Sequence, residues 1–206
     1  MNSQPFNNLT DSERFAVKGH IKIYDPTTNE IFIDKPNAIH YENFSLAMAR
    51  SLSNQGFGTI SEMCFGNGGT RVDDTGIITY LTPNTVDSSA SLYNQTYIKS
   101  IDANRPGDIL PDRNNMEVRH VAGAYYSDIL VTCLLDFGEP SGQEAFDNET
   151  TSNGTFVFDE LGLRAYSPDG PGLGPLLTHV IFHPVQKSLN RMIQIDYTVR
   201  VQSLSS

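Results

Sequence analysis

The feature that most constrains the fold is a strict two-residue alternation near the end of the sequence, RMIQIDYTVRV at residues 191–201. Every second residue from Ile193 to Val201 is large and apolar, and the residues between them are polar. Because successive side chains of a β-strand point to opposite faces, this pattern predicts a strand with one buried and one solvated face.

A β-hairpin is predicted near the start of the chain, over residues 18–34. Ile21 and Ile23 alternate with polar residues, DPTTNE supplies the turn, and the chain returns with Ile31 and Ile33 on the same face. The next segment, residues 37–54, has apolar residues at helical spacing and glycines after its end, so it predicts the one convincing helix.

Further short β-segments follow at residues 59–66, 76–82, 91–102, 115–123, 127–138, 154–166 and 176–185. The run DILVTCLLDF at 128–137 is apolar on both faces, which predicts a central place in a sheet. About ten strands with a single helix, and no strand–helix alternation, predict an all-β fold, a β-sandwich or jelly roll with one short helix.

The predicted domain organisation is an extended N-terminal arm, residues 1–17, followed by a single β-sandwich domain, residues 18–206. The arm is polar apart from two lone aromatic residues, Phe6 and Phe15, and has too few apolar residues to fold by itself. It could become ordered on a neighbouring subunit with these two residues as anchors, or it could be a frayed tail; the sequence favours neither.

Charge and composition exclude several classes of protein. A formal net charge of −10 and the lack of any Lys/Arg-rich run argue against direct nucleic-acid binding. No segment has the length of a membrane span or the character of a signal peptide. Cys64 and Cys133 lie in apolar runs without a zinc-ligand spacing, so they are expected to be buried free thiols. We expect no cofactor.

The glycine-rich stretch CFGNGGTRVDDTG, residues 64–76, invites comparison with a phosphate-binding loop. Such a loop needs a helix after it, and here Asp73 and Asp74 follow instead, so nucleotide binding is not expected. A calcium site using Asn67 with these two aspartates matches no EF-hand spacing. The favoured interpretation is that the glycines permit positive φ where a strand leaves the sheet.

Two histidines and two adjacent carboxylates are the candidates for catalytic or metal chemistry. His179 and His183 are four residues apart, but in a strand that places them about 13 Å apart, too far for one metal ion. Glu160, beside Asp159 within an apolar run, could be a catalytic acid of a polysaccharide hydrolase. The favoured interpretation is that Glu160 accepts hydrogen bonds from a neighbouring loop or subunit.

Tyr125 and Tyr126 are adjacent aromatic residues that could contact a partner. In a strand they point to opposite faces, so only one of them could stack on a sugar ring. Core or interface packing is the favoured role. The predicted interface residues are therefore the four aromatic residues Phe6, Phe15, Tyr125 and Tyr126.

Several segments together resemble small β-sandwich structural proteins of tailed-bacteriophage virions. They are the hairpin, asparagine-containing junction and helix at residues 19–54, the strand and glycine turn ISEMCFGNGGT, and the C-terminal trio FDELGLRAY, LLTHVIFHPVQKS and RMIQIDYTVRV. The resemblance is to tail, neck and fibre-attachment proteins. It spans about Lys18 to Val201 and concerns the order of these segments rather than a strict motif. It implies a non-enzymatic subunit that forms homo-oligomers and binds other virion structural proteins, made in the host cytoplasm.

Three other functions remain open from the sequence. A capsid decoration protein belongs to the same virion class and differs mainly in copy number. A carbohydrate- or receptor-binding module would use an exposed tyrosine, around Tyr125 or Tyr166, to bind a host glycan. A polysaccharide hydrolase would need a carboxylate pair near Glu160 or Asp159.

Overall fold

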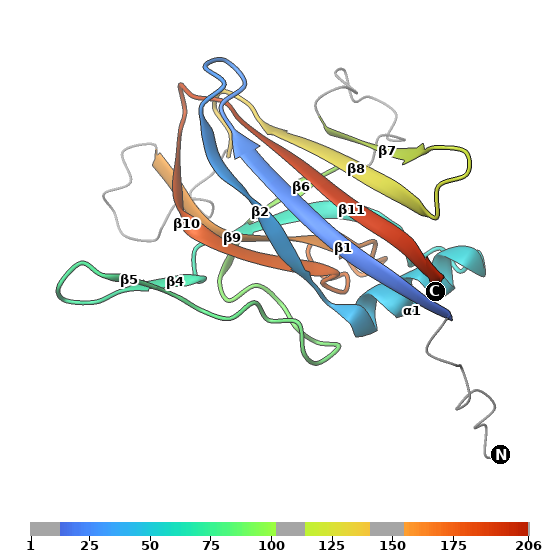
Figure 1. The fold of residues 1–206 in the computed structure, drawn as a ribbon. Coiled ribbons are helices and arrows are strands. Elements are labelled where there is room, and N and C mark those ends of the chain that lie inside the picture. Colours follow the sequence, from blue (N-terminus) through green and yellow to red (C-terminus); the bar gives the residue numbers. More distant parts are fainter. Residues whose placement is uncertain (1–12, 102–113, 141–154, 206) are drawn as a thin grey trace.

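The computed structural model describes residues 13–101, 114–140 and 155–205. These residues form eleven strands and one helix (Figure 1). The elements in chain order are β1 (Glu13–Tyr24), β2 (Ile31–Ile39), α1 (Tyr41–Leu52), β3 (Ile60–Gly66), β4 (Thr70–Val72), β5 (Ile78–Tyr80), β6 (Gln95–Ser100), β7 (Asn114–His120), β8 (Tyr126–Leu135), β9 (Thr155–Ala165), β10 (Thr178–Ser188) and β11 (Ile193–Ser205). The predicted all-β fold with one short helix is confirmed.

Nine strands form one antiparallel sheet in the order β6-β3-β9-β10-β2-β1-β11-β8-β7, and β4 pairs with β5 separately. The sheet curls on itself, so β10, β9, β3 and β6 lie behind β2, β1, β11 and β8 (Figure 1). The two halves are joined by only two residue pairs between β10 and β2. The result is a sandwich-like fold, open between β6 and β7, whose inner faces enclose the core.

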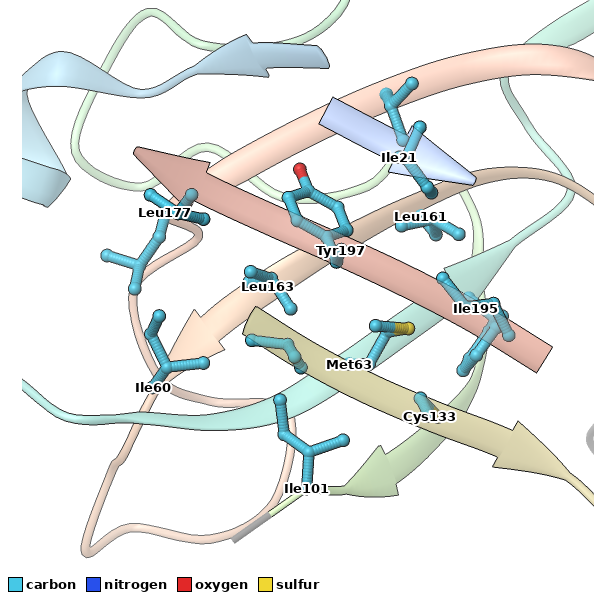
Figure 2. Packing of buried hydrophobic residues seen from close by; sticks show 14 of the residues in the cluster. Ile21, Ile60, Met63, Ile101, Cys133, Leu161, Leu163, Leu177, Ile195 and Tyr197 are labelled. Atoms are coloured by element: carbon cyan, nitrogen blue, oxygen red, sulfur yellow. The ribbon is translucent and has the colours of Figure 1, made fainter. Parts of the chain in front are cut away.

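The core lies between the two halves of the curled sheet. Figure 2 shows Tyr197, Ile195 and Cys133 from one half in the same cluster as Met63, Leu161 and Leu163 from the other. The odd-numbered residues from Ile193 to Val199 are all buried, as the alternation predicts. Burial of such apolar side chains is the main source of stability for this fold.

The hairpin of β1 and β2 forms as predicted, but Ile31 and Ile33 are not buried together on one face. A bulge after Ile23 pairs Tyr24 with Ile31, which leaves Ile31 exposed, while Ile33 packs against the core opposite Ile23. The turn is held by the Asp25 carboxylate, which accepts a hydrogen bond from the backbone N–H of Thr27 at 2.8 Å.

Helix α1 packs its buried face, Phe44 and Ala47, onto one end of the core. Its N-cap is His40, whose Nδ1 accepts a hydrogen bond from the backbone N–H of Asn43 at 3.2 Å. His40 and Asn43 are both buried, so the start of the helix is fixed by polar contacts inside the protein.

The structure corrects three details of the predicted organisation. Strand β1 begins at Glu13, so residues 13–17, predicted as arm, pair with β11; Gly19 interrupts the apolar alternation and hides this extension. Strand β8 lies next to the outermost strand β7 rather than centrally. Strand β4 falls within the glycine-rich stretch, which was expected to be only a turn. Residues 1–12, with Phe6, lie outside the described residues.

Candidate functional site

A long excursion leaves the sheet between β3 and β6. Gly66 ends β3, Gln95 begins β6, and the two residues are paired with each other. Residues 67–94, called the excursion below, therefore start and end at one point of the sheet. They carry the β4–β5 hairpin, which projects from the body of the protein on the side away from β7 (Figure 1).

The outgoing limb of the excursion is bound by two carboxylates of β9. The backbone N–H of Gly69 and that of Thr70 donate to the two oxygens of Asp159, each at 2.8 Å, and the N–H of Gly68 donates to Glu160 at 3.1 Å. The glycine-rich stretch thus binds carboxylates of its own chain through backbone N–H groups.

The glycines at the start of this loop allow neighbouring segments to approach closely. The prediction that they are needed for positive φ where the strand leaves the sheet was wrong. Gly66, Gly68 and Gly69 are not among the described glycines with positive φ; Gly76, at the hairpin tip, is, with φ +84°. A Cβ on Gly66 would lie 2.4 Å from the carbonyl oxygen of Asn94 and 2.5 Å from the Glu160 carboxylate. Only glycine lets the two limbs of the excursion lie this close.

The returning limb of the excursion is bound by the same glutamate. Glu160 accepts hydrogen bonds from the backbone N–H of Tyr93 at 2.9 Å and of Asn94 at 2.8 Å. Burial alone would raise the pKa of Glu160, but the hydrogen bonds from His179 and these N–H groups outweigh it and hold that pKa below its ordinary value. Glu160 therefore ties together both limbs as an ionised carboxylate.

His179 connects this carboxylate to a third point of the excursion. Its Nε2 lies 2.9 Å from Glu160, and its Nδ1 lies 2.8 Å from the backbone nitrogen of Asn84. Since the Asn84 N–H can only donate, Nδ1 must carry a lone pair, and the proton sits on Nε2. His179 is thus a neutral histidine that donates to Glu160 and accepts from the excursion.

The pKa of Asp159 is shifted in the opposite direction from that of Glu160. Burial raises the pKa of Asp159, and this outweighs the hydrogen bonds from Thr70 and Gly69, which lower it; the negative charge of Glu160 adds to the rise. Two adjacent buried carboxylates therefore shift in opposite directions. Glu160 accepts four hydrogen bonds, one of them from His179, against three for Asp159, and it holds the negative charge more firmly.

Helix α1 supplies a further anchor for the excursion. Nε2 of His40 lies 2.7 Å from the carbonyl oxygen of Asp87, and the side-chain amide of Asn43 donates to the carbonyl of Ser88 at 3.2 Å. The same amide donates to Leu176 at 2.9 Å, so one side chain joins the excursion to the segment before β10. The base of the excursion is fixed by the buried side chains Asp159, Glu160, His179, His40 and Asn43, the anchor cluster.

The polar side-chain atoms of the anchor cluster form hydrogen bonds within the protein, mostly with backbone groups. Glu160 and His179 have no exposed side-chain surface, and Asp159 is also buried. This confirms the prediction that Glu160 accepts hydrogen bonds from a neighbouring loop. His183 lies apart from the cluster, exposed at the surface, where one of its ring nitrogens is 3.2 Å from the Tyr80 hydroxyl.

Asp73 and Asn67, which were considered as calcium ligands in the sequence, make hydrogen bonds within the chain. Asp73 caps its own turn, accepting from the backbone N–H groups of Thr75 at 2.8 Å and Ile77 at 2.9 Å. Asn67 accepts a hydrogen bond from the side chain of Asn94. Within residues 13–101, 114–140 and 155–205, no group of three or more His, Cys, Asp or Glu side chains is placed to hold a metal ion.

The outer part of the excursion exposes apolar side chains. Ile77, at the tip of the hairpin, is 63% exposed, and Val72, Tyr80 and Val86 are also exposed. Apolar groups on a projecting, fixed hairpin are typical of a contact surface for another protein. Sequence analysis missed this surface because a three-residue strand gives no clear periodicity; its only signal was the apolar pair Val72 and Ile77 on either side of the DDTG turn.

The predicted interface aromatics are not brought together. Phe15, on β1, is 75% exposed, and Tyr125, just before β8, is 71% exposed. Tyr126 is half-buried, with the Arg200 guanidinium 3.9 Å from its ring centroid. Tyr125 is therefore the one of this adjacent pair that presents a free ring surface.

Comparison of the chain with protein-family models, with curated proteins and with solved structures finds no match. Among the described residues, no helix is long and apolar enough to cross a membrane. Cys64 and Cys133 are free and buried, as predicted.

Proposed function

We propose that this protein is a non-enzymatic structural subunit of a tailed-bacteriophage virion, which acts at the neck, tail or baseplate by binding further copies of itself and other virion proteins. The observation that carries the proposal is the excursion, a projecting hairpin with exposed apolar side chains whose base is fixed by buried hydrogen bonds. A hairpin of two short strands is marginally stable alone, so it needs such anchoring to keep one geometry.

Fixed geometry favours assembly because a preorganised contact surface loses little conformational entropy on binding. The anchor cluster holds Gly68, Asn84 and Asn94 to side chains of β9 and β10, and it holds Asp87 to α1. These contacts fix the excursion at both limbs. The hairpin can then contact a neighbour as a rigid element.

A non-enzymatic role is supported by the state of the acidic residues. Glu160 and His179 are the described groups that most resemble a catalytic pair, and both are buried with hydrogen bonds to backbone groups or to each other. A substrate could reach Glu160 only after the excursion had moved away. We therefore assign the pair to holding the excursion.

The virion setting rests on the resemblance of the sequence to tail, neck and fibre-attachment proteins. The net charge of −10 is consistent with this role, because an acidic surface avoids packaged nucleic acid and suits a basic protein neighbour. The protein would be made in the host cytoplasm and reside in the virion. A capsid decoration protein is the close alternative, with the same kinds of contact and many more copies.

A carbohydrate- or receptor-binding module is the candidate of another class, and the exposed ring of Tyr125 is the observation that favours it. A flat, exposed tyrosine can stack on a sugar ring. Screening the purified chain against bacterial surface glycans tests this. Saturable binding that is lost in Tyr125→Ala would favour the module over the assembly subunit.

Electron microscopy of the purified chain at high concentration tests the proposed function. Identical subunits joined by a contact between two different surfaces form closed rings or filaments. We expect uniform particles of one symmetry. Dispersed single subunits, together with turnover of a host polysaccharide, would overturn the proposal.

A further inference from the structure

An apolar groove lies between helix α1 and the edge of the sheet that is formed by β7. It has a volume of about 400 Å³ and is bounded by α1, the start of β3 and the strands β7, β8 and β11. Its walls are mostly apolar, and among its lining residues the single charged one is Glu117. The apolar lining includes Phe44, Met48, Leu52, Met116, Ile129 and Val201.

The rim of the groove exposes large apolar side chains. Leu52, in the last turn of α1, is 86% exposed, and Val118 on β7 is 71% exposed. Ile129, which pairs with Val118 across β7 and β8, lies deeper and packs against the core. The groove is therefore continuous with the core and not covered by any of the described residues.

The N-terminal segment enters the sheet beside this groove. In the register of β1 and β11, Glu13 pairs with Ser205 and Val17 pairs with the groove residue Val201. Phe15 shares the inner face of β1 with the buried Val17, yet it is exposed. Figure 1 shows the start of β1 and the end of β11 next to α1.

The direction of β1 bears on whether residues 1–12 enter the groove of their own copy or that of another copy. The strand runs from Glu13, at the edge of the molecule, inward past Val17. Continued backwards along its axis, the chain leads out of the protein. To reach the groove of its own copy it would have to reverse just before Glu13, whereas a second copy could present its groove along the axis of the strand. Twelve extended residues span up to about 40 Å.

We propose that the groove binds residues 1–12 of a second copy, with Phe6 as the side chain that fills it. Residues 1–12 contain Phe6 and Leu9 as large apolar side chains besides Met1, and they contain no Lys or Arg. An apolar groove with one acidic lining residue suits such a segment, because the contact gains from apolar burial and needs no charge partner. The inference rests on the proposed function and names one contact through which copies assemble.

Disulfide trapping tests which copy supplies the segment. Phe6→Cys and Leu52→Cys are made in separate full-length chains, one of them isotope-labelled, and the two are mixed under mild oxidation. The native Cys64 and Cys133 are completely buried and should not interfere. We expect a mixed, crosslinked dimer that contains one labelled and one unlabelled chain.

A matched control replaces Leu52→Cys with Thr79→Cys, an exposed site on the β4–β5 hairpin, which projects on the side of the protein away from β7 (Figure 1). We expect little crosslinking to Phe6→Cys there. In a chain that carries both Phe6→Cys and Leu52→Cys, a disulfide closed within one monomer would show that the segment binds its own copy. That result, or equal crosslinking at Thr79→Cys, would overturn the proposal.

A second measurement separates failure of this contact from failure of the proposed function. Phe6→Asp in the full chain should weaken self-association by roughly thirtyfold, because it places a charge in an apolar groove. Asn7→Asp, a matched change of charge, should leave association unchanged. If Phe6→Asp self-associates as strongly as the wild-type chain, the groove proposal fails while assembly through another surface stands. If the wild-type chain does not associate, both fail.

Discussion

The Nε2 atom of His179 lies 2.9 Å from a carboxylate oxygen of Glu160, and neither side chain has any exposed surface. The same carboxylate accepts backbone hydrogen bonds from both limbs of the excursion. A pair with the composition of an acid–base site therefore holds a projecting hairpin in place. Five predictions follow from this arrangement and from the surfaces around it.

Glu160→Gln should destabilise the fold by about 3 kcal/mol. The amide presents N–H donors to backbone N–H groups or to His179, so at least one buried donor loses its acceptor. Urea unfolding followed by tyrosine fluorescence measures the change, since the chain has no tryptophan. The matched control is the exposed Glu42→Gln, expected within about 0.5 kcal/mol of the wild type. Equal stability of all three proteins would contradict the anchoring role.

The stabilising effect of Glu160 should disappear in acid. Its pKa is lowered in the folded state, so its contribution is complete above the unfolded value of about 4.3 and is lost as pH falls through the lower folded value. The raised pKa of Asp159 acts with the opposite sign; its largest cause is burial, which both proteins share, and only the smaller contribution from the Glu160 charge is lost in the variant. The difference in unfolding free energy between wild type and Glu160→Gln should therefore shrink below pH of about 4. A difference independent of pH would show that charge on Glu160 is unimportant.

Gly66→Ala should destabilise the protein more than Gly76→Ala. A methyl group on Gly66 meets the Asn94 carbonyl and the Glu160 carboxylate, whereas Gly76 has open space and only the strain of its positive φ. We expect a loss of about 3 kcal/mol for the first substitution and about 1 kcal/mol for the second. Thermal melting of both variants checks the order; the reverse order would mean that the limbs are not held this closely.

Both cysteines should be unreactive in the native protein. Burial raises the pKa of Cys64 and of Cys133 to about 12, so almost no thiolate is present near neutral pH, and the sulfur atoms are inaccessible. Mass spectrometry after maleimide treatment should show no adduct under native conditions and two adducts in denaturant. Rapid native labelling of either residue would indicate that the core opens readily at that strand.

Ile77→Asp should weaken self-association without weakening the fold. Ile77 is exposed at the hairpin tip, so its replacement removes apolar contact area and costs the isolated subunit little. Thr79→Asp, also exposed on the hairpin, introduces the same charge as a control. Native mass at several concentrations should show a shift toward smaller species for Ile77→Asp alone. An equal effect of both substitutions would indicate general charge repulsion.

The strands and the helix could largely be predicted because their periodicity reflects burial directly. Ile193 to Val201 alternate as a half-buried strand should, and Phe44 and Ala47 lie on the buried face of α1. The early start of β1 could not be predicted in this way. Gly19 replaces an apolar residue in the alternation, and a Cβ at this position would displace the side chain of Asn37.

The site was only partly predictable from the sequence. Glu160 stood out as a carboxylate within an apolar run, and its bonding to a loop follows from the cost of burying an unpaired charge. Its donors could not be identified, because Gly68, Tyr93 and Asn94 act through backbone groups that carry no sequence signal. The groove between α1 and β7 was also missed, since it depends on how distant elements pack.

Sedimentation velocity of the full-length protein over a wide range of concentrations tests the central claim most directly. An assembly subunit with an anchored apolar hairpin should form a discrete oligomer whose population rises with concentration. A single monomeric species at every concentration would contradict the claim that this protein assembles from copies of itself.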